Sequence, residues 1–387
     1  MSNSVLSKPL TVVHIISGLA VGGAEMMLYK LVSATDRQLY RPVVISLISG
    51  GELQGQIEAE DVPVYSLGMQ RGLSSIGALS KLRRFISELQ PDIIQGWMYH
   101  GNLAAIIART IAPGRPFLVW SIRQSLYDLR YEKLLTRQVI RLNRFFSLAP
   151  DSVLYNSHLS KRQHEDFGFS KEKSKVIFNG FDLEKFSFSP GETKDVCSSL
   201  AIPSNAVCIG HVGRHHFMKD HPVFLVAARE IAGRYPNTYF LLSGKDVVPE
   251  NKELVTLVPE QLRSRFFFLG ERKDIPAIMQ SLDIFVSSSL AEGFPNVLGE
   301  AMAVGVPCVA TDVGDSSVVV GPAGMIVKSR NKDALVEAMD HLFSLPEEER
   351  QYLGRKGRLR IEQHFSIKAI AAQYSELYQQ LMSTRIN

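Results

Sequence analysis

The sequence predicts an α/β protein made of two doubly wound domains, each with a parallel sheet. Short apolar runs of strand length alternate with helical patterns along the chain, which is the pattern of a parallel sheet with right-handed crossovers. The alternation stops after residue 182 and restarts at residue 207. At 387 residues, the chain also exceeds the size at which one hydrophobic core usually stops growing. We therefore expect two facing domains with a ligand cleft between them.

Composition indicates a soluble globular protein, with 45% hydrophobic and 21% charged residues. A net charge of +4 is too small to indicate nucleic-acid binding, so we expect no nucleic-acid partner. Cys197, Cys208 and Cys308 have neither a disulfide framework nor metal-ligand spacing, which predicts reduced thiols in a cytosolic setting.

The N-terminal apolar run allows two interpretations. Lys8 followed by residues 10–24 resembles a signal peptide, but His14 and Ser17 interrupt the run and a glycine turn follows it. We interpret the run as a buried first strand. No other run approaches the roughly 20 apolar residues of a membrane span, so any membrane contact is expected to be peripheral.

The first half contains a regular series of elements. Buried strands are predicted at 11–17, 43–47, 62–66, 93–96, 117–122, 152–155 and 175–178. Helices are predicted from the glycine turn to residue 32 and at 53–60, 76–89, 102–111 and 129–146, and Ser157 is predicted to cap another helix. A polar segment at 183–203 is interpreted as the linker between the domains.

The carboxyl ends of the first-half strands are the expected ligand edge of that sheet. Gly22 and Gly23 follow the first strand and open a helix, an arrangement that lets a phosphate approach the backbone. The alternative is an ordinary tight turn, and the spacing does not match a dinucleotide fingerprint. The ends of two later strands carry residues 97–100, including His100, and the pair Arg123 and Gln124.

The predicted helix at 129–146 carries a basic stripe. Its members recur at steps of three or four residues: Arg130, Lys133, Arg137, Arg141 and Arg144. An apolar series is expected on another face: Tyr131, Leu135, Val139, Leu142 and Phe146. One interpretation is an ordinary solvated face. The other is peripheral docking on an anionic membrane surface, where each basic residue contributes about 1 kcal/mol.

The second half repeats the pattern from the strand at 207–212 onward. Arg214 and Lys219 lie between that strand and a helix at 222–234, and they could clamp a diphosphate. The alternative is two exposed basic residues in a loop. Further strands are predicted at 238–242, 266–269, 284–287, 307–310 and 325–327, and residues 333–382 are predicted to be almost wholly helical.

The segment 292–310 is predicted to form a loop, a helix, a turn and a strand. Pro295 suits the first helical turn, and the amides of Asn296 and Val297 would face an anion above the helix start. Val297, Ala301 and Val304 are expected to form the buried face. Glu292 precedes the helix and Glu300 lies about two turns along it. Their alternative interpretation is an ordinary helix-start charge and a solvated side chain.

Four motifs in order resemble glycosyltransferase family 4, a family of retaining enzymes with the GT-B fold of two facing Rossmann-like domains. They are Gly22-Gly23-Ala24-Glu25, the segment 178–182, Gly213-Arg214 with Lys219, and Glu292-Gly-Phe-Pro followed by Glu300. The last motif runs into Ala-Met-Ala-x-Gly-x-Pro and is the most specific. The resemblance covers nearly the whole chain and implies domains at 1–184, with a C-terminal crossover helix at 366–387, and at 185–365.

The resemblance implies a role for each matched residue. Arg214, Lys219 and Glu292 would be catalytic, with the two cations on the donor diphosphate and Glu292 beside the donor sugar. The implied donor site would also contain Gly22, Gly23, Gly270, Phe294, Pro295, Asn296, Val297 and Glu300, with Glu271 near the base. The first domain would supply the two glycines, and Glu300 would hold the ribose hydroxyls. Retention in the family is attributed to front-face attack, with the leaving phosphate helping to deprotonate the acceptor.

Two sequence features bear on cofactors and on the acceptor side. The chain contains no Asp-x-Asp pair, so we expect no cofactor and no required metal. Many family members carry a His after the strand at 117–122, whereas this chain carries Arg123. His100 is a possible substitute, which makes His100 and Arg123 the acceptor-side candidates, although a hydrogen-bonded loop histidine is an equal alternative.

The implied activity is transfer of a hexosyl or N-acetylhexosaminyl group from a UDP- or GDP-sugar to a glycan or polyprenyl-linked acceptor. This would serve cell-surface polysaccharide or lipopolysaccharide biosynthesis, in the cytoplasm or at the inner face of the cytoplasmic membrane. Two alternatives remain: a sugar-nucleotide epimerase of the same architecture, which needs no acceptor, and a non-catalytic relative. The presence of Arg214, Lys219, Glu292 and Glu300 together argues against the second.

Overall fold

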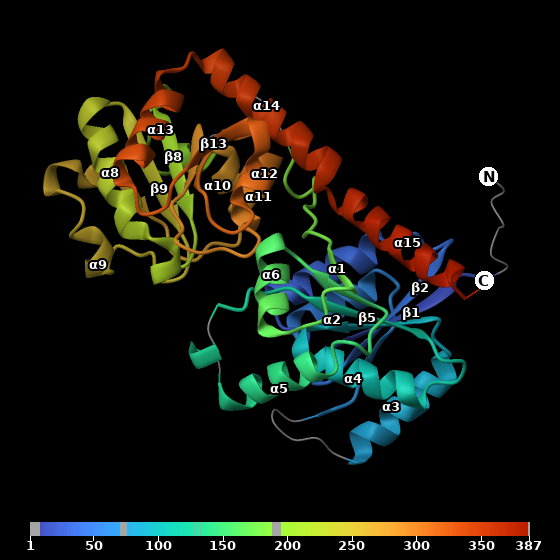
Figure 1. The fold of residues 1–387 in the computed structure, drawn as a ribbon. Coiled ribbons are helices and arrows are strands. Elements are labelled where there is room, and N and C mark those ends of the chain that lie inside the picture. Colours follow the sequence, from blue (N-terminus) through green and yellow to red (C-terminus); the bar gives the residue numbers. More distant parts are fainter. Residues whose placement is uncertain (1–7, 70–75, 128, 132, 188–194, 386–387) are drawn as a thin grey trace. The chain divides into compact units, whose positions relative to one another are not determined.

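The computed structural model describes residues 8–69, 76–127, 129–131, 133–187 and 195–385. The chain folds into two compact units (Figure 1). The N-terminal unit is Met1–Gly180 together with Ile367–Asn387, and the C-terminal unit is Phe181–Ser366. The sequence predicted boundaries after residues 184 and 365. Each unit is a Rossmann-like domain with a parallel sheet, as the sequence predicted.

The N-terminal sheet has seven parallel strands in the order β3-β2-β1-β4-β5-β6-β7. Their bounds are β1 (Leu10–Ile16), β2 (Tyr40–Ser46), β3 (Val64–Ser66), β4 (Ile93–Trp97), β5 (Phe117–Ile122), β6 (Ser152–Tyr155) and β7 (Ser174–Val176). All seven residues of β1 are buried, which agrees with the interpretation of this run as a first strand. The strand order reverses between β1 and β4, so their carboxyl ends border a crevice.

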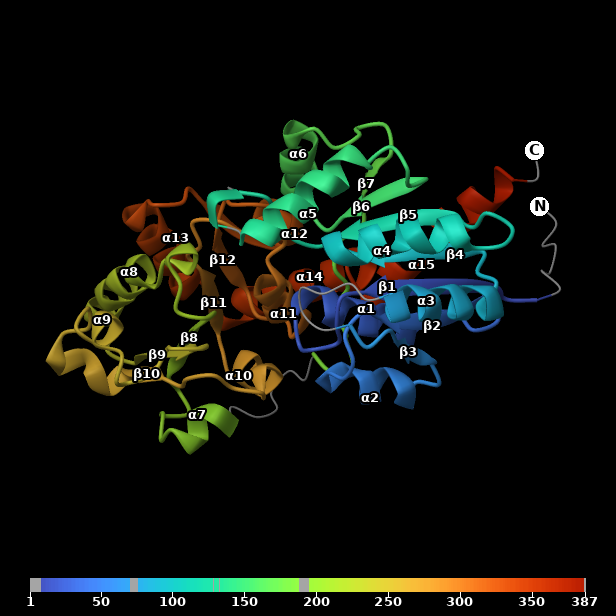
Figure 2. The same cartoon turned by 90° about the horizontal axis from the view of Figure 1, so that it is seen from below.

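Helices cover both faces of this sheet (Figures 1 and 2). Their bounds are α1 (Gly23–Ala34), α2 (Glu52–Ala59), α3 (Ile76–Leu89), α4 (Met98–Ile111), α5 (Leu134–Phe145), α6 (His158–Phe167) and α15 (Ile367–Ser383). One core cluster joins β1 and β2 to α1, α2 and α15, and a second joins the opposite face to α3 and α4. Ser157 caps α6 by accepting the amide of Ser160, as predicted.

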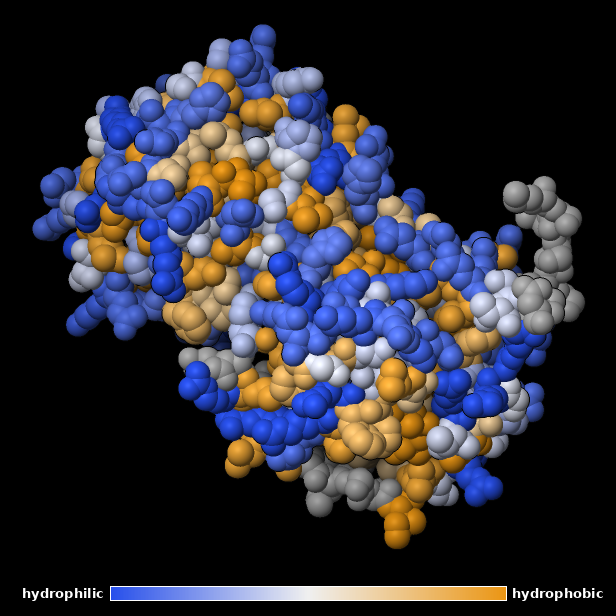
Figure 3. Space-filling view, viewed as in Figure 1, coloured by the Kyte–Doolittle hydropathy of each residue, from blue (hydrophilic) through white to orange (hydrophobic). Residues whose placement is uncertain are grey.

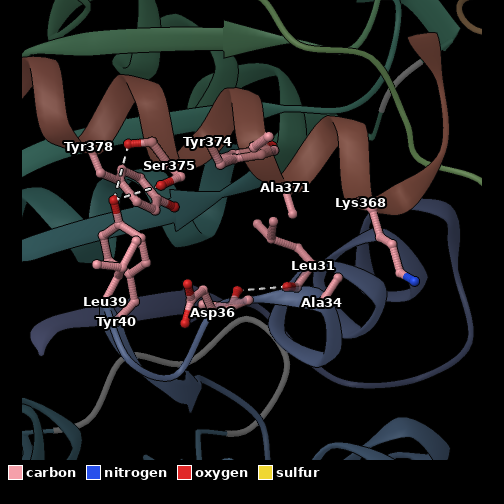
Figure 4. Close-up of a pocket in the computed structure, with 12 residues that line it drawn as sticks. Leu31, Ala34, Asp36, Leu39, Tyr40, Lys368, Ala371, Tyr374, Ser375 and Tyr378 are labelled. Carbon is pink, nitrogen blue, oxygen red and sulfur yellow. Dashed lines mark hydrogen bonds between the residues drawn. The ribbon is translucent and has the colours of Figure 1, made fainter. Parts of the chain in front are cut away.

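The last helix of the chain, α15, packs on the N-terminal unit. Ile370, Tyr374 and Leu377 are buried in the same cluster as α1. Figure 4 shows Tyr40 of β2 reaching Ser375 of α15, where its hydroxyl lies 3.1 Å from the backbone oxygen and 3.0 Å from the side-chain oxygen. A cavity of about 280 Å³ remains between α1, β2 and α15. The chain therefore completes its first core with its last helix.

The C-terminal sheet has six parallel strands in the order β10-β9-β8-β11-β12-β13. Their bounds are β8 (Val207–Val212), β9 (Thr238–Ser243), β10 (Phe266–Phe268), β11 (Ile284–Ser287), β12 (Cys308–Thr311) and β13 (Gly324–Val327). The longer helices are α8 (His221–Arg234), α11 (Asn296–Ala303), α13 (Lys332–Ser344) and α14 (Glu347–His364). Here the strand order reverses between β8 and β11.

Close helix packing in this unit depends on a glycine. Gly305 has a φ of +78° and ends α11, as predicted. Gly354 in α14 lies so near this turn that a Cβ there would fall on the carbonyl oxygen of Gly305. Backbone atoms cannot move aside as a flexible side chain can, so α11 and α14 approach each other only with glycine at this position.

Two sequence predictions need correction, and one contact was not predicted. Helix α4 begins at Met98, four residues before the predicted start, because it follows β4 directly. The predicted linker contains a short helix, α7 (Asp195–Ser199). Cys197 on α7 lies 3.0 Å from Cys208 on β8, measured between the sulfur atoms. Their spacing in the sequence did not predict this contact, although neither thiol forms a disulfide and both, like that of Cys308, are buried.

The glycine contact predicts opposite outcomes at two helical glycines of the C-terminal unit. Gly354→Ala should lower the free energy of unfolding by about 1–3 kcal/mol, because the added methyl group overpacks against backbone. Gly233→Ala in α8 should raise it by roughly 0.5–1 kcal/mol, because open space surrounds Gly233 and alanine favours helix. Urea unfolding of both variants measures the difference. Equal stabilities would contradict the proposed packing.

Candidate functional site

Two loops of the C-terminal unit are hydrogen-bonded to each other at the point where its strand order reverses. One follows β8, and the other follows β11 and leads into α11. The Leu290 amide donates to the Met218 carbonyl oxygen at 2.8 Å. The Ser288 hydroxyl lies 3.0 Å from the carbonyl oxygens of both Lys219 and Asp220. These bonds join two segments that are far apart in the sequence into one surface.

An ion pair links the same two loops. The Lys219 ammonium donates to Oε1 of Glu292 at 2.5 Å, and their side chains are 22% and 11% exposed. The Ser289 hydroxyl donates to the same carboxylate oxygen at 2.7 Å. The sequence predicted both charged residues but neither their direct contact nor Ser289. Arg214 lies in the β8 loop and is exposed, which leaves its guanidinium accessible to an anion.

Two buried histidines lie beneath the β8 loop. His211 on β8 and His221 at the start of α8 have ring centroids 4.5 Å apart. Burial lowers the pKa of His221 to about 4 and that of His211 well below its ordinary value. His211 contacts the Ser288 hydroxyl at 3.2 Å. Neutral rings therefore support the loop that carries Lys219, a feature that the sequence analysis missed although both histidines flank the Arg214 and Lys219 motif.

The start of α11 differs in detail from its prediction. Pro295 is the N-cap rather than a helical residue, and the Asn296 amide donates back to the Phe294 carbonyl oxygen at 3.0 Å. The predicted pair of amides is thus reduced to that of Val297. Val297 itself is only partly buried, whereas Ala301 and Val304 are buried as predicted, together with Leu298, Gly299, Met302 and Ala303.

The other carboxylate of this motif, Glu300, lies in the second turn of α11 and is partly buried. The loop that precedes α11 packs closely against the backbone of Gly314, which has a φ of +58°. A Cβ at Gly314 would fall on the Glu292 carbonyl oxygen. Glycine at this position therefore lets the two loop backbones meet.

Two further glycines lie at the carboxyl ends of the neighbouring strands. The Gly244 amide, after β9, donates to the Gly270 carbonyl oxygen at 2.8 Å. Gly270 has a φ of +67° and is buried, while Glu271 beside it is exposed. The loops after β8 and β11 thus carry Arg214, Lys219, Glu292, Phe294 and Pro295, and the first two turns of α11 carry Asn296, Val297 and Glu300. Gly270 lies at the same sheet edge.

The remaining predicted residues lie in the N-terminal unit. Gly22 is the N-cap of α1 and Gly23 is its first residue. The Glu25 carboxylate accepts a hydrogen bond from the backbone amide of the same residue, and burial raises the pKa of the carboxyl group. This carboxylate lies beside Gly22, where a phosphate was expected to approach.

The two acceptor-side candidates have different environments. Arg123 is 7% exposed and donates to the carbonyl oxygens of Ile177, at 2.7 Å, and Phe178, at 3.3 Å. Its guanidinium also lies 5.8 Å from the centre of the Trp97 ring. His100, in the first turn of α4, is exposed at the crevice of the sheet, and desolvation lowers its pKa. Of the two, His100 is the side chain that faces solvent.

Helix α5 is shorter than predicted and buries a different face. It covers Leu134–Phe145, after a single 3-10 turn at Leu129–Tyr131. Its buried residues are Ile140 and Asn143. Most of the series that was predicted as its apolar face is exposed instead, including Leu135, Leu142 and Phe146. The basic residues of α5 are therefore accompanied by exposed apolar side chains.

The described residues contain neither a candidate metal cluster nor a candidate membrane-spanning helix. Among them, no group of three or more His, Cys, Asp or Glu side chains could hold a metal ion. In the same part of the chain, no helix combines the length and apolarity that crossing a bilayer requires.

Family models match both halves of the chain. The model described as "Glycosyltransferase Family 4" matches residues 21–185, and the model described as "Glycosyl transferases group 1" matches residues 206–344. The first match covers β2 to β7 of the N-terminal sheet, and the second covers all six strands of the C-terminal sheet. Together they cover most of the sequence and contain the glycine loop, both cations and both carboxylates described above.

Individual proteins show the same similarity. The UDP-Gal:alpha-D-GlcNAc-diphosphoundecaprenol alpha-1,3-galactosyltransferase of Escherichia coli is 30% identical over 173 residues, 43% of this chain and 44% of that protein. The chain thus spans less than half the length of that relative. The lipopolysaccharide core biosynthesis mannosyltransferase LpsB of Rhizobium meliloti is 26% identical over 297 residues, which are 70% of this chain and 81% of that protein. The structure of Anabaena Alr3699/HepE in complex with UDP matches this one with a TM-score of 0.79 at 24% sequence identity. The match covers 96% of this chain and 100% of that chain.

The buried histidines predict a loss of stability in acid. His221 has an ordinary pKa of 6.5 when unfolded and about 4 when folded, so below pH 6.5 the unfolded chain binds a proton that the folded chain does not. Neutral His221 therefore does not reduce the free energy of unfolding above pH 6.5, and it reduces it progressively as the pH falls towards 4. At pH 5 this reduction is about 2 kcal/mol. Thermal unfolding at pH 7 and pH 5 should show a smaller pH effect in His221→Gln than in the wild type, while His364→Gln, at an exposed position, should match the wild type.

Proposed function

This chain belongs to glycosyltransferase family 4, and from that premise we propose that it is a retaining, metal-independent glycosyltransferase that uses a UDP- or GDP-sugar. The observation that carries the proposal is the Lys219–Glu292 pair, held at 2.5 Å by two mutually bonded loops with the exposed Arg214 alongside. Loops at the strand-order reversal of a doubly wound sheet are where such sheets bind ligands. The family's glycosyltransferases supply the reaction class.

The two cations suit a diphosphate leaving group. In the proposed reaction the bond between the anomeric carbon and the diphosphate oxygen breaks, and a bond from the acceptor oxygen to the same carbon forms on the same face. The acceptor proton passes to the leaving phosphate. Arg214 provides a planar two-pronged donor and Lys219 a point charge for the negative charge that develops. A preorganised donor of this kind contributes about 3 kcal/mol to lowering the barrier.

Glu292 is proposed to position the donor sugar. Its carboxylate is fixed by Lys219 and by the Ser289 hydroxyl, both bonded to one oxygen. These two bonds hold the carboxylate at the strand-order reversal, where the donor sugar is proposed to lie. When a diphosphate binds, Lys219 gains a second anionic partner, and the carboxylate keeps the bond from Ser289. Metal independence is supported by these cations and by the absence of an Asp-x-Asp pair from the sequence.

The donor class is supported by named relatives. The E. coli relative is named as using UDP-Gal, and solved relatives of the same fold are described in complex with UDP and with UDP-glucose. Glu300, one helical turn beyond Asn296, is proposed to bind the ribose hydroxyls. Gly270 and Gly244, whose backbones are bonded to each other, are proposed to border the base.

The proposed acceptor is a glycan or polyprenyl-linked saccharide used in cell-surface polysaccharide or lipopolysaccharide synthesis. The E. coli relative acts on a diphosphoundecaprenol-linked sugar, and LpsB acts in lipopolysaccharide core biosynthesis. Such acceptors support a location at the inner face of the cytoplasmic membrane. Helix α5 is the proposed contact, because exposed Leu134, Leu135 and Phe145 accompany its basic residues.

A nucleotide panel tests the donor site. UDP, GDP, ADP and their sugars are added in EDTA, and the melting temperature is measured. One base should stabilise the protein, since a ligand at ~100 times its dissociation constant adds about 2.7 kcal/mol. The shift should be lost in Lys219→Ala. Transfer by Lys219→Ala and Glu292→Gln should fall about 10²- to 10³-fold.

The matched control is Lys332→Ala, because Lys332 forms another lysine–glutamate pair of this unit, with Glu230 at 2.6 Å. It should keep both the nucleotide shift and the activity. Full activity in Lys219→Ala or Glu292→Gln would refute the site. An altered sugar recovered on its nucleotide without an acceptor would identify an epimerase instead.

Liposome flotation tests the membrane contact. Charge reversal at Arg137, Arg141 and Arg144 should release the protein from vesicles rich in anionic lipid, since each basic residue contributes about 1 kcal/mol near the surface. The matched control reverses the charge at three lysines of the C-terminal unit, Lys245, Lys252 and Lys273. Unchanged flotation of the α5 variant would reject this contact.

A further inference from the structure

Two cavities of the N-terminal unit meet at His100 to form one groove, here called the α3–α5 groove. The first, about 720 Å³, lies between the β1–α1 loop and the start of α5. The second, about 420 Å³, lies between α3 and α4. His100, Leu47 and Met69 line both. Each volume is within the range of ordinary small-molecule sites.

The groove begins where a ligand is expected in this type of sheet. Its first part is lined by Gly18, after β1, and by His100, after β4. These two strands are adjacent and mark the reversal of strand order in the N-terminal sheet. The position corresponds to that of the Lys219–Glu292 pair, at the reversal between β8 and β11 in the other sheet. A doubly wound sheet binds ligands in this crevice.

The second part of the groove is almost wholly apolar. Among its eleven lining residues, all described in the structure, His100 is the one polar side chain. Ile76 at its rim is 91% exposed, and Leu79 and Ile107 are about half exposed. Figure 3 shows apolar surface gathered over the region of α3 and α4. An exposed apolar concavity of this extent indicates a binding surface.

The first part of the groove has a largely apolar lining that also contains several polar side chains, among them one cation and one carboxylate. Its lining includes Ser17, Glu25, Lys133 and Thr136. Arg137 follows one helical turn after Lys133, and Figure 3 shows a hydrophilic band over α5. The groove therefore has its charged side chains, Lys133 and Glu25, in its first part, and a second part without charged residues among its described lining. Lys133 can pair with the anionic head of an amphiphile whose apolar chain follows the second part.

We propose that the α3–α5 groove binds the isoprenoid chain of a lipid-linked acceptor, with the phosphate-bearing head at Lys133 and His100. The inference rests on the proposed function, which supplies the acceptor class. It adds the site: the chain would lie along Leu79, Leu103 and Ile107, between α3 and α4. The head would lie at the crevice between β1 and β4.

An isoprenoid fits this groove better than a peptide does. Every peptide unit carries an amide and a carbonyl group that need hydrogen-bond partners when buried. The described lining, with its one polar side chain, does not supply them, whereas a hydrocarbon chain needs none. Burial of each methylene group contributes about 0.8 kcal/mol. Leu134 and Leu135, 73% and 71% exposed on α5, continue the apolar rim towards the surface proposed to meet the membrane.

Direct binding of farnesyl diphosphate, below its critical micelle concentration, tests the proposal by calorimetry. The wild type should bind it more tightly than inorganic diphosphate, roughly tenfold or more, because the chain adds apolar burial. Ile107→Asp should weaken farnesyl diphosphate binding by a similar factor. Leu142→Asp is the matched control, since Leu142 is 47% exposed against 45% for Ile107 but lies outside the groove.

Ala104→Trp gives an independent check by filling the apolar tract, and a retained melting temperature shows that it folds. Equal binding of farnesyl diphosphate and inorganic diphosphate by the wild type would overturn the proposal. Unchanged farnesyl diphosphate binding in both groove variants would do the same. A dimer in sedimentation that Ile107→Asp dissociates would instead assign the groove to a second copy of the chain. Nucleotide-induced stabilisation, which depends on the other unit, should persist in all variants, so failure of the donor site is detected separately.

Discussion

In each unit, parallel pairing of two strands that are distant in sequence determines where a ligand-binding crevice can form. In the C-terminal sheet β8 pairs with β11, and in the N-terminal sheet β1 pairs with β4. The next strand in sequence pairs on the other side of β8 and of β1, so the loops after the two paired strands diverge and leave a crevice. This constraint brings Lys219 and Glu292, 73 residues apart, into contact. It also places His100 opposite the β1–α1 loop.

The surroundings of the ion pair keep its charges available for a ligand. The mostly buried ammonium and carboxylate compensate each other, which avoids the cost of leaving either charge alone in a poorly solvated place. Burial keeps His211 and His221 neutral, so they support the loop without adding positive charge beneath Lys219. The bonds from Ser288 and Leu290 are backbone-directed and do not depend on protonation. The proposed diphosphate would thus meet preorganised donors.

The sequence predicted elements better than it predicted contacts. Apolar periodicity located β5, β6 and α3 to the residue, because burial on a sheet or helix face dictates the pattern directly. The charged motif located Lys219 and Glu292, but it did not reveal that the two side chains meet. Such pairing depends on tertiary placement of loops, as does the turn of the Asn296 amide towards Phe294. Periodicity also failed on α5, because a helical stripe does not indicate which face meets the protein.

The burial of Arg123 determines which groups remain at the N-terminal crevice. Its guanidinium is bonded to the carbonyl oxygens of Ile177 and Phe178 and lies over Trp97, so its charge ties the end of β5 to the segment after β7. The crevice is left with neutral His100, an apolar tract, and the Lys133 cation and Glu25 carboxylate at one end. A free sugar phosphate would gain little from the apolar tract. An amphiphile gains from both ends of the groove, and the separation of charge from apolar surface therefore favours a lipid-linked acceptor.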